Sequence, residues 1–300
     1  MKLFISILLL PLLFCSCQKN ETQSNETKPT VAVTNYPLYY FADRLAGDLC
    51  EVRFDAPADV DPAFWQPDAE AIANFQQADL ILLNGATYEK WISKTTLPED
   101  TLIDTSKNFK TNLIETNDAT SHAHGDGDLH NHAGTAFTTW LDLQQASQQA
   151  ETISKSLVQL LPQHKDLIIE RNDELQQELN QLHTEFTRVA ASIKEPLLAS
   201  HPVYHYFART YQLRMPSLIW EPEMVLNDDH LEELQIQKDI YSSARFFIWE
   251  GEALPQLVET LKQQGLTSIV ISPCFNRPEE GDFLTVMKSN LQALQSTIQP

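Results

Sequence analysis

Short apolar runs alternate with amphipathic stretches along most of the chain, which predicts strands and helices in turn. Runs rich in β-branched and large aliphatic residues predict strands. The predicted strands cover residues 30–36, 51–54, 78–84, 197–200, 246–249 and 267–272. Apolar residues at helical spacing predict shorter helices, which cover residues 38–48, 68–77, 204–211, 254–264 and 282–298. Alternating strands and helices with short turns indicate open, mainly parallel α/β sheets.

The middle of the chain interrupts this alternation. Residues 141–161 form one long helical pattern, which stops at Pro162, and residues 165–194 form a second. We therefore predict an α/β fold of two lobes, each a mainly parallel sheet flanked by helices, joined by a long bridging helix with a ligand cleft between the lobes. The predicted division is an N-terminal lobe over 31–140, a linker helix over 141–162 and a C-terminal lobe over 163–300.

Polar residues follow several of the predicted strands. In open α/β sheets, ligands bind outside the carboxyl ends of the strands. We expect these residues to meet across the cleft between the lobes. They are Asn35, Asn84, Ser200 with His201, Glu250 after Trp249, and Ser272.

The N-terminus predicts export and lipid anchoring. Lys2 precedes an apolar run of about a dozen residues, too short for a membrane span, which requires ~20. Small Ser16 precedes Cys17, as in bacterial lipoprotein processing sites, so we expect a signal peptide over 1–16 and lipidation at Cys17. An ordinary cleaved secretory signal is the alternative. Residues 17–30 are polar and predict a disordered tether.

Composition narrows the function classes. The formal charge of −20, from 41 acidic and 21 basic residues, disfavours binding to nucleic acid. Cys50 and Cys274 lie far apart, and we expect no disulfide between them. The chain has no CxxC pair, no HExxH motif, no nucleophile elbow and no glycine-rich phosphate loop, so we predict that it is not an enzyme.

A histidine-rich segment lies within residues 120–135, which read as a loop. Two His-x-His pairs flank two aspartates, and neutral imidazoles close together can chelate zinc or copper. The alternative is a solvated loop with incidental metal affinity. The histidines concerned are His122, His124, His130 and His132.

Three further residues stand at the ends of predicted elements. His201 is either a functional cleft residue or a helix-start residue hydrogen-bonded to backbone. Glu250 ends a buried strand, where a carboxylate is costly unless paired, so it either ligates metal in the cleft or caps the following turn. Asp142 is expected to cap the long helix, because acids favour helix starts.

Several motifs resemble one family along the chain from about residue 31 to the end. They are Asn35–Gly47, Asp61–Pro67, Gln77–Gly85, Tyr88–Trp91, Trp140–Asp142, Ser200–Tyr211 and Phe246–Glu250. Together these motifs resemble the substrate-binding proteins of zinc/manganese ABC transporters. The resemblance implies a two-lobed fold with metal held in the cleft between the lobes.

The resemblance also implies four metal-ligand positions, two in each lobe. The histidine of an Asp-Pro-His motif corresponds to Ala63, and the histidine two residues before Trp-Leu-Asp corresponds to Thr138. In the second lobe, His201 matches the third ligand. The fourth ligand implied by the family is a carboxylate just before a proline, and this chain has Ser272 at that position. Alanine cannot ligate, and neutral hydroxyls are poor zinc ligands. We therefore expect the metal contacts to move to His201, Glu250 and the histidine-rich loop.

The function expected from the family is capture of zinc, with manganese as second choice, outside the cytoplasm and its delivery to an ABC transporter permease. The protein is expected to be a monomer anchored by lipid in the bacterial cell envelope, facing the periplasm or the cell exterior. The alternative is a family member whose cleft no longer holds a bare metal ion. Such a protein would bind an organic ligand or a metal complex, or act as an adhesin or partner-docking protein.

Overall fold

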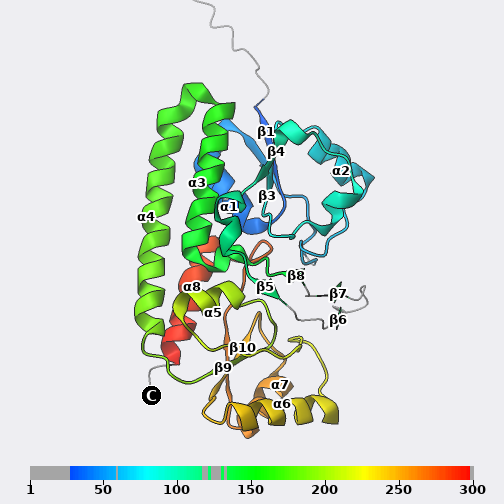
Figure 1. Cartoon of the computed structure of the whole chain (residues 1–300), viewed down its shortest axis with the longest axis vertical. Coiled ribbons are helices and arrows are strands. Elements are labelled where there is room, and N and C mark those ends of the chain that lie inside the picture. Colours follow the sequence, from blue (N-terminus) through cyan, green and yellow to red (C-terminus); the bar gives the residue numbers. More distant parts are fainter. Residues whose placement is uncertain (1–27, 59, 117–120, 123–129, 132–133, 298–300) are drawn as a thin grey trace, which may run out of the picture.

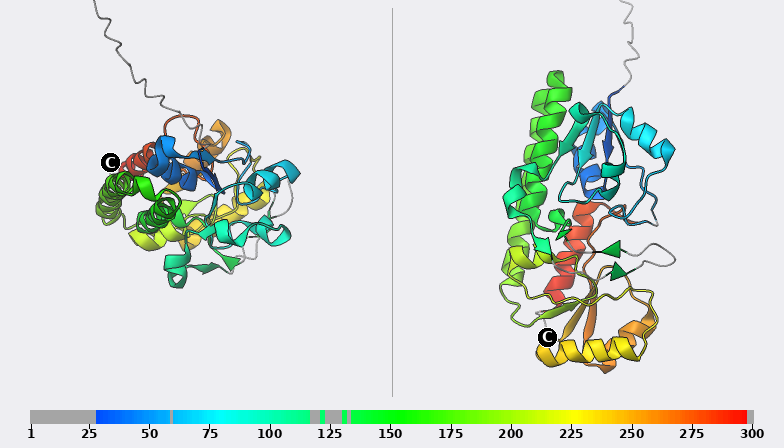
Figure 2. Two further views of the ribbon diagram at one scale, coloured as in Figure 1. Left: turned by 90° about the horizontal axis from the view of Figure 1, so that it is seen from above. Right: turned by 45° about the vertical axis from the view of Figure 1, so that its right-hand side comes forward.

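The computed structural model describes residues 28–58, 60–116, 121–122, 130–131 and 134–297. The predicted signal peptide, Cys17 and most of the predicted tether lie outside these residues. Figures 1 and 2 show the two sheets one above the other along the long axis, with a pair of long helices beside the first. Among the described residues, none of the helices is both long and apolar enough to cross a membrane.

The first sheet has the strand order β2-β1-β3-β4, and all its strands are parallel. Alternate strand residues pack on opposite faces, as the pleat requires. Val31 and Leu82 join a cluster with α1 and α3, whereas Ala32 and Ile81 pack with Phe75 of α2. Its strands and flanking helices are β1 (Thr30–Val33), α1 (Tyr36–Ala46), β2 (Glu51–Arg53), α2 (Ala69–Gln76), β3 (Leu80–Leu83) and β4 (Leu102–Asp104).

The second sheet has the order β11-β10-β9 and is also parallel. Its two faces are again covered differently, since Ala199 and Ile248 belong to the same large cluster as Val31 and Leu82, while Phe247 and Trp249 pack in a separate cluster. Its elements are β9 (Leu197–Ala199), α5 (His205–Tyr211), α6 (Asp228–Ile240), β10 (Phe246–Trp249), α7 (Pro255–Gln263), β11 (Thr267–Val270) and α8 (Phe283–Ser296). The predicted α/β fold with two parallel-sheet lobes is confirmed.

Two long helices, α3 (Leu143–Leu160) and α4 (Lys165–Ala190), lie side by side next to the first sheet (Figure 1). Asp142 caps α3, because its Oδ1 accepts hydrogen bonds from the backbone N–H groups of Gln144 and Gln145, as predicted. Helix α4 packs against α1, α3, α5 and α8. One hydrophobic cluster therefore joins residues of both sheets through α4.

Short elements complete the described chain. The antiparallel pairs are β5 (Glu115–Thr116) with β8 (Gly134–Thr135), and β6 (Ser121–His122) with β7 (His130–Asn131). The 3₁₀ turns are η1 (Gly47–Leu49), η2 (Lys90–Lys94), η3 (Glu99–Thr101), η4 (Lys107–Asn112), η5 (Thr139–Leu141) and η6 (Pro162–His164).

Strands β4 and β5 and helix α6 lie outside the predicted elements, and the predicted loop over 120–135 contains the short strands β6, β7 and β8. Strand β4 has three residues, all half-buried, too few to show a period. Helix α6 buries one residue, Leu234, so it has almost no apolar stripe, and its start is set instead by the Asn227 capping box. The remaining predicted strands and helices are present with shifts of one to a few residues at their ends. Cys50 and Cys274 are both free, in agreement with the expectation of no disulfide between them, and both are buried.

Candidate functional site

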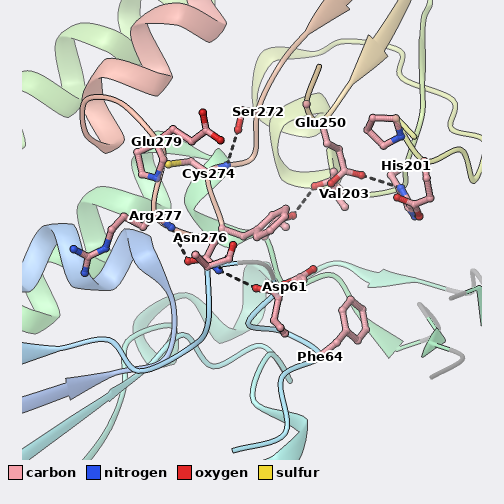
Figure 3. Close-up of a pocket in the computed structure, with 18 of the residues that line it drawn as sticks. Asp61, Phe64, His201, Val203, Glu250, Ser272, Cys274, Asn276, Arg277 and Glu279 are labelled. Carbon is pink, nitrogen blue, oxygen red and sulfur yellow. Dashed lines mark hydrogen bonds and ion pairs between the residues drawn. The ribbon is translucent and has the colours of Figure 1, made fainter. Parts of the chain in front are cut away.

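A cleft of about 810 Å³ lies between the two lobes (Figure 3). The first lobe contributes the loop after β2, with Asp61 and Phe64, and the segment at Phe137 and Thr138. The second lobe contributes the residues that follow its strands and a segment over 272–279 between β11 and α8. The cleft predicted between the lobes is therefore present.

The second-lobe side chains converge because its parallel strands end at one edge of the sheet. His201 follows β9, Glu250 follows β10 and Ser272 follows β11, and all three line the cleft. Asn35 and Asn84, predicted to meet them from the first lobe, do not line it. Both asparagines are fully buried beneath the cleft, where Asn35 Nδ2 donates to Asn84 Oδ1 at 3.3 Å.

His201 is 2% exposed and stands between two glutamates. Its Nδ1 lies 2.9 Å from Glu250 Oε1, a hydrogen-bond distance, and its Nε2 lies 3.6 Å from Glu221 Oε1. A carboxylate on Nδ1 fixes the orientation of an imidazole ring and raises the basicity of the other nitrogen. Figure 3 shows Glu250 beside His201 at the second-lobe side of the cleft. The predicted candidates His201 and Glu250 are therefore in contact, with Glu250 on the ring nitrogen away from Glu221.

Glu221 is a cleft residue that sequence reasoning missed. It follows a segment that runs beside β9, since Leu218 N donates to Ala199 O and Trp220 N donates to Ser200 O, each at 2.9 Å. The tripeptide Ile-Trp-Glu occurs twice, at 219–221 and 248–250. In both copies the tryptophan packs in the second-lobe core and the glutamate reaches the cleft beside His201. That repeated tripeptide is the signal by which Glu221 could have been found.

The cleft lining is strongly acidic. Among the described lining residues, five carry carboxylates and one carries a guanidinium, Arg277. The Arg277 guanidinium lies 4.6 Å from the centre of the Tyr39 ring. A narrow cleft lined by one sign of charge concentrates counter-ions, so this cleft attracts cations. The acidic residues are Asp61, Glu221, Glu223, Glu250 and Glu279.

Three of the four ligand positions implied by the family resemblance hold no metal ligand. Ala63 is 1% exposed and offers no donor. The Thr138 hydroxyl donates to Val203 O at 2.5 Å, and the Ser272 hydroxyl accepts from Cys274 N at 3.2 Å. Among the described residues, no group of three or more His, Cys, Asp or Glu side chains is arranged to hold a metal ion. His201 is the one position of the four that keeps a strong metal donor.

The histidine-rich loop is described in part. The antiparallel register of β6 and β7 pairs His122 with His130. His124 and His132 lie outside the described residues. Figure 1 shows β6 and β7 at a level between the two sheets, on the side away from α3 and α4.

One asparagine links the lobes beside the cleft. Asn276 Nδ2 donates to three backbone carbonyl oxygens of the first-lobe loop, those of Pro57 at 2.7 Å, Val60 at 2.8 Å and Ala58 at 3.3 Å. The adjacent Phe275 carbonyl accepts from Tyr36 N at 3.2 Å. Sequence reasoning missed Asn276, because nothing in its neighbourhood distinguishes it from a surface turn residue.

A buried carboxyl group supports the cleft from the first lobe. Glu89 is 6% exposed and accepts hydrogen bonds from Thr34 Oγ1 and Asn84 N, each at 2.6 Å, and from Gly85 N at 3.3 Å. Burial raises its pKa from 4.5 to about 7, although the hydrogen bonds act in the opposite direction. The same network reaches the cleft wall, because Asn84 Nδ2 donates to Phe137 O at 2.9 Å.

Comparison with known proteins identifies one family. The family model described as "Zinc-uptake complex component A periplasmic" matches residues 31–297. The zinc-binding lipoprotein AdcA of Streptococcus pneumoniae strain R6 is 25% identical over 316 residues, which cover 98% of this chain and 60% of AdcA. The chain therefore spans less than two thirds of that relative's length.

Two further similarities cover nearly whole chains. The high-affinity zinc uptake system protein ZnuA of Bacillus subtilis is 24% identical over 293 residues, covering 94% of this chain and 92% of ZnuA. The crystal structure of the metal-dependent lipoprotein YcdH from Bacillus subtilis superposes with a TM-score of 0.78 at 21% identity, covering 91% of this chain and all of YcdH. This structural likeness supports the two-lobed fold.

Proposed function

Because this chain belongs to the family of periplasmic zinc-uptake complex component A proteins, we propose that it is the substrate-binding component of a metal ABC uptake system. It captures zinc outside the cytoplasm and delivers it to a membrane permease. The observation that carries the proposal is His201, buried at a strand end and facing an acidic cleft between two lobes. The role is transport, not catalysis.

The geometry around His201 supports a choice of metal contacts within the cleft. Glu250 on Nδ1 orients the ring, so the metal binds at Nε2, the nitrogen that faces Glu221. Glu250 therefore acts as a positioning residue instead of the direct ligand expected from the sequence. His122, His124, His130 and His132 form a second, outer capture site on their loop.

Zinc is favoured over manganese by the donor types. Imidazole nitrogen suits zinc, whereas manganese prefers sites dominated by oxygen. The family name and the zinc-binding relatives agree with this choice.

The location follows from the N-terminus. We propose that Cys17 carries the lipid and that the protein acts as a monomer in the cell envelope, facing the periplasm or cell exterior. The relatives named lipoproteins support an envelope location. A permease is the expected protein partner, and nucleic acid is not expected on the acidic surface.

The test is equilibrium zinc titration of the metal-stripped full-length chain. Removing the four loop histidines and replacing His201 by alanine should each weaken zinc binding by at least tenfold, and the two changes together should abolish it. His164→Ala, between α3 and α4, is the matched control and should bind like the wild type. Absence of any submillimolar zinc or manganese binding by the wild type would refute metal uptake and favour docking of an organic ligand or a protein partner.

A further inference from the structure

The separation between His201 and Glu221 fits two ligands of one ion. His201 Nε2 lies 3.6 Å from Glu221 Oε1, longer than an ordinary hydrogen bond. Two ligands bound to one zinc at about 2.0–2.2 Å, in near-tetrahedral geometry, lie roughly 3.3–3.6 Å apart. The pair is therefore spaced for a shared metal ion.

The described cleft residues do not complete the coordination. Zinc takes about four ligands in proteins. Ala63 has no donor, and the hydroxyls of Thr138 and Ser272 make the backbone hydrogen bonds given above. No third histidine, cysteine or acid among the described residues is arranged with the pair to hold a metal. Two coordination positions are left for groups that this part of the chain does not supply.

The cleft has far more room than an ion requires. Its volume is about 810 Å³, whereas a water molecule takes roughly 30 Å³ in the liquid. Cavities of about 300–1,000 Å³ are typical of small-molecule sites. Part of the wall is apolar, with Val60, Phe64, Phe137, Val203 and Phe275 facing the space. The cleft therefore has the size and the mixed lining of a site for a small organic molecule.

The charge of the cleft limits which organic molecule enters with the metal. Five lining carboxylates against one guanidinium repel a complex with net negative charge, such as zinc citrate. An amino acid of the histidine type that fills the two remaining coordination positions with its amine and imidazole nitrogens keeps an ionised carboxylate, so it carries one negative charge when bound. Its one-to-one complex with zinc keeps a charge of plus one, which the acidic cleft attracts.

We propose that the cleft binds zinc as a complex with an amino-acid chelator of the histidine type, with His201 Nε2 and Glu221 supplying two metal ligands and the chelator supplying the others. This inference rests on the proposed function and specifies its substrate. The loss of three ligand positions then follows from a change of substrate form, because the chelator takes over the coordination that those residues would have provided.

The experiment uses the full-length chain with the four loop histidines replaced by alanine, so that zinc binding reports on the cleft. Retention of isotopically labelled L-histidine is measured by equilibrium dialysis, once without zinc and once at a fixed free zinc concentration. The zinc affinity is then measured with and without L-histidine. We expect at least tenfold tighter zinc binding with L-histidine, and one histidine retained per zinc only when zinc is present. Citrate in place of L-histidine should give no increase.

Variants assign the effect to the proposed pair. His201→Ala and Glu221→Gln should abolish zinc-dependent retention of histidine, whereas Glu232→Gln, on the exposed face of α6, should leave it unchanged. Zinc binding of equal strength with and without L-histidine overturns this inference and leaves the proposed function standing. Absence of zinc binding in both conditions overturns the inference together with the cleft's part in the proposed function.

Discussion

Replacing Glu89 by glutamine should remove a large pH dependence from the stability of the first lobe. The pKa of the folded-state carboxyl group is raised by burial to about 7, from an ordinary value of 4.5. The folded state therefore binds this proton more tightly than the unfolded state. The stabilisation that this tighter proton binding gives the folded state is fully present below about pH 4.5 and is lost as the pH rises through about 7. Between pH 5 and pH 8 the loss is about 2.5 kcal/mol, at 1.36 kcal/mol per pKa unit.

The assay is urea unfolding followed by tryptophan fluorescence at several pH values from 5 to 8. Glutamine has the same shape and no charge, so its effect on the hydrogen bonds is a constant offset and the change with pH isolates the carboxyl group. The stability of Glu89→Gln relative to wild type should rise by about 2.5 kcal/mol from pH 5 to pH 8. Glu174→Gln, on the exposed side of α4, removes the same charge where water solvates it and is the matched control. A difference between Glu89→Gln and wild type that stays constant with pH would refute the reasoning.

Three further experiments test the structure elsewhere. Asn276→Ala removes the donor shared by three first-lobe carbonyl groups and should lower the free energy of unfolding by about 1–2 kcal/mol in urea titration; no change would mean that this link does not stabilise the fold. Gly85→Ala should cost roughly 3 kcal/mol or more, because its φ is +74° and the new Cβ would lie 2.1 Å from a carboxylate oxygen. Gly265→Ala, with φ +77° and no described atom within 4 Å of the new Cβ, should cost only about 1 kcal/mol, and equal costs would contradict the steric explanation. Burial raises the pKa of Cys50 to about 11 and of Cys274 to about 12, so iodoacetamide at pH 8 should label both thiols after unfolding and neither before, as checked by peptide mass spectrometry.

Much of the fold was predictable from the sequence because its strands are short, apolar and bounded by turns. The strand ends at His201, Glu250 and Ser272 followed from the general position of ligand sites in parallel sheets, and the structure brings these three to one cleft. The same rule was wrong for Asn35 and Asn84, which are buried beneath the cleft. The rule identifies the edge of a sheet, but it does not say which polar side chains are then covered by neighbouring segments.

The partners of His201 could not be predicted from spacing. Glu221 reaches it from a segment that follows α5 and lies beside β9, so the contact depends on the path of a connection with no regular period. Glu250 was a candidate, but its role depends on which imidazole nitrogen it meets, and that is set by side-chain orientation. Asn276 was missed for a related reason, since its partners are backbone carbonyl groups more than 200 positions earlier in the chain.

Helix α4 makes the two lobes one mechanical unit. Its 26 residues extend about 39 Å, and the hydrophobic cluster around it includes residues of both sheets. Rotating one lobe away from the other would separate close-packed side chains along that length, which is costly in a well-packed interior. Ligand entry and exit are therefore expected to move the cleft rim, at residues 55–58, 60–67 and 272–282, while the long helices stay in place. Small-angle X-ray scattering should then give the same radius of gyration with and without ligand.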